Sequence, residues 1–370
     1  MKLKRFMPVL LAAALSVSAL AGCGNAIDGE KAGATLDGEE ISLGFMNFMA
    51  RYQQAIYDSY FGTGIWTQDL TGDGSSMEDS VKSQVAEEIE TLYLLEKHMA
   101  DYNVEITKEE QTKIDEAAQK FMDDNTKKAI TQIGATTEYV KEMLRLSTIQ
   151  SKMRAAMDAE VDTEVSDEEA AQKAISYVRV DNTSTTDEDG ETIEYTEEEK
   201  EALKSDLEAF ITLAADDFEG AAETAGYTAS DHTYGEDDVT LDDAVKEAAD
   251  KLKDGEISDI VTTDDSYYVI RMNSTFDEEA TESKKEEIVE NRKNDHYTEV
   301  CDGYKEEAEF VLNEEEWAKV KFDEYFTLKQ VEATEGDTTD DSTDTDSTDD
   351  MEDAESVDST DDTDSTEDAE

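Results

Sequence analysis

The feature that most constrains the fold is a hairpin pattern at residues 255–272, GEISDIVTTDDSYYVIRM. Two short runs of β-branched and aromatic residues flank an Asp-Asp turn, as expected of paired antiparallel strands. In the second run Tyr268 alternates with Ile270 and Met272, so we expect these three side chains on one face of a sheet. Because the surrounding chain has helical periodicity, the pattern predicts an α+β fold in which a small sheet is set among helices.

A third strand is predicted upstream, at residues 175–180, ISYVRV. A polar loop follows it and leads to a helix at 196–216. Then come a short helix from Phe218 to Ala225 that Gly226 closes, an irregular stretch at 227–239 and a helix at 241–252. This order predicts one small sheet-and-helix domain that ends with the hairpin.

The N-terminal part is expected to be helical. Residues 34–42 indicate a small hairpin with Asp37-Gly38 at its turn, and Ser42 is suited to cap the next helix. Spacings of three and four residues predict one buried face of that helix, made of Phe45, Phe48, Met49, Tyr52, Ile56 and Tyr60. Trp66 and Leu70 are expected to pack down the loop that follows.

Further helices are predicted at 77–102, from Thr107 to about 124 and at about 136–160. Thr107 and Glu110 have the spacing of a capping box, and Ser166 indicates another helix start. The helix at 77–102 is expected to bury Val81, Val85, Ile89, Leu92 and Leu95. Residues 280–312 are expected to form one long charged helix, and the aromatic segment 313–328 to dock elsewhere on the fold.

The first 23 residues resemble a bacterial lipoprotein leader. A positive start with Lys2, Lys4 and Arg5 precedes an apolar run that ends Leu20-Ala21-Gly22-Cys23. The resemblance implies cleavage before Cys23 and a lipid on its thiol, so that the protein is anchored at the extracytoplasmic face of the cell membrane without a transmembrane helix. The alternative is an ordinary secretory leader with a chance cysteine.

The formal net charge of −65 tells against nucleic acid as a partner, because nucleic-acid binding needs clustered Lys and Arg. The charge suits cationic partners, divalent ions or solubility. Residues 331–370 are Asp, Glu, Ser and Thr without Lys or Arg, and we expect them to be disordered. Their spacing does not make a calcium loop, so no metal and no cofactor is expected.

Hydrolase motifs are absent from the sequence. Cys301 follows His296 by five residues, which raises the alternatives of a nucleophile and of plain helix packing.

The sheet-forming segments resemble the parvulin family of prolyl isomerases. Residues 252–258, LKDGEIS, and 266–272, SYYVIRM, are similar to the family's L-x-x-G-E-I-S phrase and its last strand. The stretch from Phe218 to Ala222 is similar to its F-x-x-L-A helix, and 175–180 to its first strand. With the lipoprotein leader, an N-terminal helical part and a long helix after the hairpin, the chain as a whole resembles the PrsA- and SurA-type extracytoplasmic foldases.

The resemblance implies a groove that holds proline, lined here by Ser176, Asp231, Leu241, Val245, Tyr268 and Met272. Ser176 and Tyr268 stand where the family has histidines, Leu241 and Val245 where it has Met and Phe, and Asp231 where it has Cys or Asp. The groove therefore keeps an apolar lining and loses both imidazoles. His232, beside Asp231, is either a substitute or a plain surface residue.

The expected function is that of a foldase or chaperone that binds unfolded or nascent secreted polypeptides, with weak or absent prolyl isomerase activity. Two alternatives stay open: an active parvulin-type isomerase, and an acidic surface lipoprotein that is no chaperone. A homodimer is also left open.

The expected organisation has six parts. They are a signal peptide at 1–22, a tether at 23–33, a helical N-terminal domain at 34–165, a parvulin-like domain at 170–277, a C-terminal helix region at 278–330 that packs on the N-terminal domain, and the acidic tail at 331–370.

Overall fold

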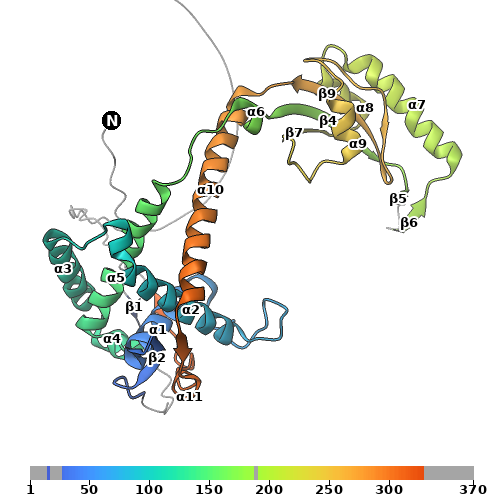
Figure 1. Ribbon diagram of the computed structural model, residues 1–370. Coiled ribbons are helices and arrows are strands. Elements are labelled where there is room, and N and C mark those ends of the chain that lie inside the picture. Colours follow the sequence, from blue (N-terminus) through green and yellow to red (C-terminus); the bar gives the residue numbers. More distant parts are fainter. Residues whose placement is uncertain (1–14, 17–26, 187–190, 329–370) are drawn as a thin grey trace, which may run out of the picture. The chain divides into compact units, whose positions relative to one another are not determined.

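The computed structural model describes residues 15–16, 27–186 and 191–328 (Figure 1). Cys23 and the acidic tail lie outside these residues. The helices are α1 Leu43–Phe61, α2 Met77–Lys97, η1 Met99–Tyr102, α3 Lys108–Asp124, α4 Lys127–Ile133, α5 Thr137–Asp158, α6 Asp167–Ala170, α7 Glu197–Ala214, α8 Phe218–Ala225, α9 Asp243–Ala249, α10 Glu278–Glu307 and α11 Glu314–Trp317. The strands are β1 Leu15–Ser16, β2 Ala32–Leu36, β3 Glu39–Ser42, β4 Lys173–Asp181, β5 Ser184–Thr186, β6 Thr192–Glu194, β7 Ala229–Tyr234, β8 Val261–Thr262, β9 Ser266–Ser274, β10 Phe310–Leu312 and β11 Thr327–Leu328.

The predicted hairpin at the start of the helical part is present, and it gains a third strand. β2 and β3 pair around Asp37 and Gly38, whose positive φ angles of 50° and 84° suit a tight turn. β10 pairs with the other edge of β2, so residues 310–312 form a strand where we expected helix. The helix α10 ends at Glu307 because the free edge of β2 offers backbone partners to the segment beyond it.

The main core lies among α1, α2, α4 and α5, and it includes the C-terminal segment at 313–326. Trp317, Phe322 and Phe326 are buried in this core. The guanidinium of Arg51, on α1, donates hydrogen bonds to the backbone oxygens of Lys321 (2.6 Å) and Glu324 (2.9 Å). The aromatic segment therefore docks on the helical core and completes it.

Three residues expected in this core lie outside it. Ile56 is only half-buried, and Tyr60, in the last turn of α1, is 73% exposed. In the loop that follows, Trp66 is buried as expected and donates a hydrogen bond to Asp58 (2.7 Å), but Leu70 is exposed. The five residues of α2 that were predicted to be buried are all buried.

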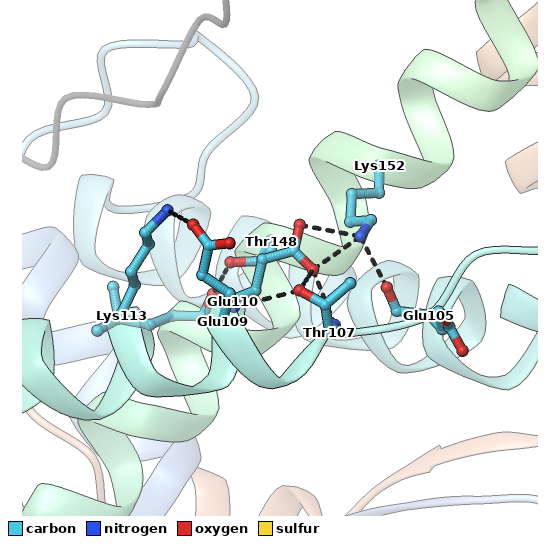
Figure 2. Close-up of polar contacts among 8 residues, drawn as sticks. Glu105, Thr107, Glu109, Glu110, Lys113, Thr148 and Lys152 are labelled. Carbon is cyan, nitrogen blue, oxygen red and sulfur yellow. Dashed lines mark hydrogen bonds and ion pairs between the residues drawn. The ribbon is translucent and has the colours of Figure 1, made fainter.

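The start of α3 is fastened to α5 by a capping box with an added lysine (Figure 2). The Thr107 backbone N–H donates to the Glu110 carboxylate (2.9 Å), and the Glu110 N–H donates to the Thr107 hydroxyl (3.2 Å). Lys152 Nζ, on α5, lies 2.9 and 2.8 Å from the two carboxylate oxygens of Glu110 and 2.7 Å from the Glu105 carbonyl oxygen. These bonds lower the pKa of Glu110 to about 2.

The C-terminal part of α10 packs against α2 and α5 through a small apolar cluster. Leu95, Ile149, Met153 and Cys301 are buried there, and the ring of His98 stacks on Tyr304 with centroids 3.7 Å apart. Burial raises the pKa of the Cys301 thiol, so this residue behaves as a packing residue and not as a nucleophile.

The second sheet has four antiparallel strands in the order β7-β4-β9-β8. β4 and β9 are the strands predicted at 175–180 and 266–272. The hairpin is confirmed, with Thr263 N–H donating to the Ser266 carbonyl across the turn (2.9 Å). Helices pack on both faces of this sheet, and together with the helical core already described they confirm the predicted α+β fold class (Figure 1).

No helix within the described ranges is long and apolar enough to cross a membrane.

Candidate functional site

The four-stranded sheet has two covered faces, and alternation along the strands decides which residues reach each face. One face packs on α7 and α8 through Val178, Tyr267 and Val269. The other packs on α9 through Ile175, Ile270 and Met272. We call the second one the α9 face; the candidate groove was predicted to lie there, around Tyr268.

Four of the six predicted groove residues lie on the α9 face. Val245 and Met272 are fully buried and Leu241 nearly so, in one apolar cluster with Ile270 and Tyr234. Tyr268 is half-buried at the edge of this cluster. Val245 and Met272 are thus core residues of the sheet, while Tyr268 keeps an accessible side.

The other two residues, Ser176 and Asp231, lie on the opposite face. They are directly opposite each other on β4 and β7, and the Ser176 hydroxyl donates to the Asp231 carboxylate (2.6 Å). The Asn273 side-chain amide donates to the same hydroxyl (2.8 Å). Ser176 and Asp231 therefore link β4 to β7 on the face opposite to the α9 face, and they do not share a surface with Tyr268.

The residue of β4 that does share a surface with Tyr268 is Tyr177. A shift of one residue along a strand moves a side chain to the other face, so Ser176, which was expected in the groove, lies on the opposite face of the sheet from Tyr268. The rings of Tyr177 and Tyr268 lie 5.7 Å apart between centroids. The sequence does contain a signal for the face on which Tyr177 lies. Tyr177 is two residues from Ile175, an expected core residue, and alternate residues of a strand reach the same face.

Arg179 completes a group of three polar side chains on this face, which we call the tyrosine site: Tyr177, Tyr268 and Arg179. Arg179 is directly opposite Tyr268 in the ladder, and its guanidinium lies 6.0 Å from the centre of the Tyr268 ring. Hydrogen bonds to the Ser266 hydroxyl (2.8 Å) and to the Asp265 carboxylate (3.1 Å) hold the guanidinium in place. Sequence reasoning missed Arg179, because an arginine in a strand pattern gives no sign of its neighbours.

Burial raises the pKa of Tyr268, and the nearby Asp265 adds to this rise while Arg179 opposes it. The phenol therefore stays protonated at neutral pH and can donate a hydrogen bond. It cannot exchange a proton near neutrality as an imidazole does. Prolyl isomerisation needs no covalent bond to break, but its barrier of about 18–20 kcal/mol must be lowered by stabilising the twisted amide.

His232 is held by a partner of its own. It lies on β7 opposite Ile175, hence on the α9 face, and its Nε2 is 3.0 Å from the Asp238 carboxylate. Burial of Asp238 disfavours its charge, but hydrogen bonds from the Leu241 backbone and from His232 outweigh this and bring the pKa of Asp238 to about 2. This contact fastens the loop before α9 to the sheet.

Within the described ranges, no three His, Cys, Asp or Glu side chains are grouped so as to hold a metal ion.

Most of the sheet-and-helix domain matches a known domain family. Residues 183–285 match the family model described as the PPIC-type PPIASE domain, that is, a peptidyl-prolyl isomerase domain. The chain carries a PPIC-type domain. This match confirms the predicted parvulin-like domain. The matched residues include Tyr268, and they begin after β4, the strand that carries Tyr177 and Arg179.

Solved structures with some likeness to the chain are foldases and chaperones. The foldase protein PrsA from Lactococcus lactis is 17% identical with a TM-score of 0.34, over 78% of this chain and 97% of that chain. The peptidylprolyl isomerase PrsA from Bacillus cereus is 20% identical with a TM-score of 0.28, over 69% and 97%.

A third chain, from a study of the SurA-like chaperones PEB4 and Cj1289 of Campylobacter jejuni, is 10% identical with a TM-score of 0.27, over 76% and 98%. Because these TM-scores are low, the proposals below rest on the residues of this chain. A search among curated proteins found no match.

Proposed function

We propose that this protein is a lipid-anchored extracytoplasmic foldase that binds unfolded secreted polypeptides and has weak or no prolyl isomerase activity. The observation that carries the proposal is a PPIC-type domain whose α9 face presents Tyr177 and Tyr268. The parvulin resemblance implies imidazoles in this part of the domain. The tyrosine site keeps aromatic side chains but has no imidazole, and His232 on the same face is held by Asp238. The α9 face therefore retains the means to hold a chain and loses the usual means to catalyse its isomerisation.

Exposed aromatic side chains on the helical core support a binding function. Tyr60 and Phe61 are 73% and 67% exposed at the end of α1, with ring centroids 6.5 Å apart. Tyr57 extends this group, 5.7 Å from Phe61 between centroids. Large exposed apolar groups that lie together are uncommon on proteins without a partner, and they suit the apolar side chains of an unfolded polypeptide.

Isomerase activity and client binding are separated by two measurements on one preparation. We expect the cis/trans exchange rate of an X-Pro peptide, measured by NMR, to stay close to its value in buffer. We expect a fluorescent unfolded secreted protein to bind, as measured by anisotropy. Exchange that is accelerated many-fold would favour the active isomerase, and absence of binding at excess protein would favour the acidic surface lipoprotein.

Membrane attachment through Cys23 and the division into domains are part of the proposal. Cys23 lies outside the described residues, and its lipidation is supported by the leader motif. We propose domain bounds at 34–165, 170–277 and 278–330. The packing of α10 on α2 and α5 supports grouping the last part with the first.

A further inference from the structure

The chain enters its fold very soon after Cys23. Residues 23–33 were expected to form a tether, but Ile27 already packs against the main helical core. Lys31 Nζ forms an ion pair with Glu316, on α11 (2.7 Å). At most four peptide links, from Cys23 to Ile27, therefore separate the predicted lipid from the described fold.

The point of entry is fixed to one end of the helical body. The N–H of Gly44 donates to the Gly29 carbonyl (3.1 Å), and the N–H of Leu43 donates to the Lys31 carbonyl (2.7 Å), so the entering chain is bonded to the start of α1. Gly29 also lies close to the hydroxyl of Tyr139, which would be 3.5 Å from a Cβ at Gly29. Because Tyr139 is in the first turn of α5, the starts of α1 and α5 lie together at the entry point.

Chain geometry then limits the distance to the membrane. Four residues span at most about 14 Å at about 3.6 Å each. A residue that carries two or more acyl chains is held stably at the lipid surface. We propose that the end of the helical body formed by the starts of α1 and α5 is held against the lipid headgroups by the lipid on Cys23. This inference rests on the proposed lipidation.

The same geometry places the other end of α5 away from the attachment point. The helix has 22 residues, so its C-terminal end lies about 33 Å from its start. The chain leaves α5 at this far end and continues toward the PPIC-type domain. The membrane-facing end and the exit toward that domain are therefore opposite ends of one helix.

The described part of the membrane-facing end exposes several acidic side chains. Asp28, Glu30 and Glu138 are exposed there, and Lys31 is engaged by Glu316. Bacterial and synthetic anionic bilayers repel such a surface over about a Debye length, about 8 Å at physiological salt. The short tether therefore keeps the membrane-facing end close to the headgroups, and attraction between the protein and the headgroups does not.

Energy transfer to labelled lipids tests the inference on the lipidated full-length protein. In a Cys301→Ala background, a donor dye is attached at Glu138→Cys, in the first turn of α5, or at Ala155→Cys, an exposed position near its other end. The proteins are reconstituted into phosphatidylcholine–phosphatidylglycerol vesicles that contain a headgroup-labelled acceptor lipid. We expect transfer to be several-fold higher from position 138 than from position 155.

Insertion of 20 Gly/Ser residues after Gly24, with a span of about 25 Å, should lower transfer from position 138 toward that from position 155. Equal transfer from both positions, or transfer from position 138 that the insertion leaves unchanged, would overturn the inference. Cys23→Ala should abolish co-flotation with vesicles, and co-flotation of this variant would overturn the tether mechanism. If the parent protein itself fails to float, the proposed lipidation is wrong, a result distinct from floating protein with equal transfer.

Discussion

At the scale of residues, the aromatic side chains at the end of α1 are large apolar groups that are mostly exposed to solvent. Tyr60 and Phe61 bury little of their surface, although the helix on which they lie buries most of its apolar face. A side chain that is exposed in the folded state costs little stability when it is made polar, whereas a client-binding role requires its apolar surface.

We therefore expect the double variant Tyr60→Ser/Phe61→Ser to bind an unfolded client several-fold more weakly at an unchanged melting temperature. Anisotropy of a labelled client and thermal unfolding measure the two quantities. Leu213→Ser, which changes an exposed leucine on α7, is the matched control and should leave affinity unchanged. Equal client affinity in the double variant and the parent would exclude these aromatics from binding.

The tyrosine site shows which features of a site can be predicted from the sequence and which cannot. The apolar pattern of the last strand correctly predicted that Tyr268 shares a face with Ile270 and Met272. Ser176 was expected beside Tyr268 but lies on the other face, because a resemblance to a family phrase does not fix which face of the sheet a strand residue reaches. The Tyr268–Arg179 contact depends on the register of two strands about 90 residues apart, which local sequence does not encode.

At the scale of elements, the C-terminal segment is held by buried polar contacts on α1. Arg51 is 4% exposed and donates to two backbone oxygens of this segment. If Arg51 is replaced by Met, the Lys321 carbonyl loses its donor, the Glu324 carbonyl keeps only the Gln54 amide (3.0 Å), and a buried cationic contact is lost. We expect the free energy of unfolding to fall by about 3 kcal/mol, measured by urea denaturation.

Lys321→Met is the control for this variant, since the Lys321 side chain is 55% exposed and its pairing with Glu78 (3.6 Å) should contribute little. A loss for Arg51→Met no larger than that of the control would show that the segment is held by its aromatic side chains alone.

The contact between α3 and α5 gives the chain an acid-sensitive element (Figure 2). The pKa of Glu110 is about 2 in the folded state against 4.5 for an unperturbed group. Because the folded pKa is the lower one, this stabilisation is fully present above about pH 4.5 and is lost as the pH falls toward 2.

Glu110→Gln should therefore lower the free energy of unfolding by about 1 to 2 kcal/mol at pH 7, an amount that allows for the partial exposure of the pair. The difference from the parent should shrink as the pH is lowered to 3. Glu116→Gln, an exposed site on α3, is the control and should show no such difference. A Glu110→Gln effect that is the same at both pH values would contradict the role of the charged pair.

The helices that were predicted from caps or strong periodicity are present. Strands that form only by pairing with a distant segment were not predicted. Ser42, Thr107, Ser166 and Thr196 all cap helices through their side chains. β7 and β10 were not predicted, because each is a strand only by virtue of the edge that it pairs with. The short helix α4 and the small β5–β6 hairpin were also missed, since their sequences are polar and brief.

At the scale of the whole molecule, the chain joins an acidic helical body to a PPIC-type domain that lacks imidazoles at its tyrosine site. A protein of this kind is expected to act by holding unfolded chains, so its effect should not depend on proline in the client. An active isomerase would help only those clients whose folding waits for a slow X-Pro bond.

The most direct test measures light scattering from a denatured secreted protein without proline residues, as it aggregates with and without this protein. We predict that aggregation is suppressed in proportion to added protein, up to full suppression near stoichiometric amounts. Unchanged aggregation of the proline-free client at stoichiometric excess would contradict the account.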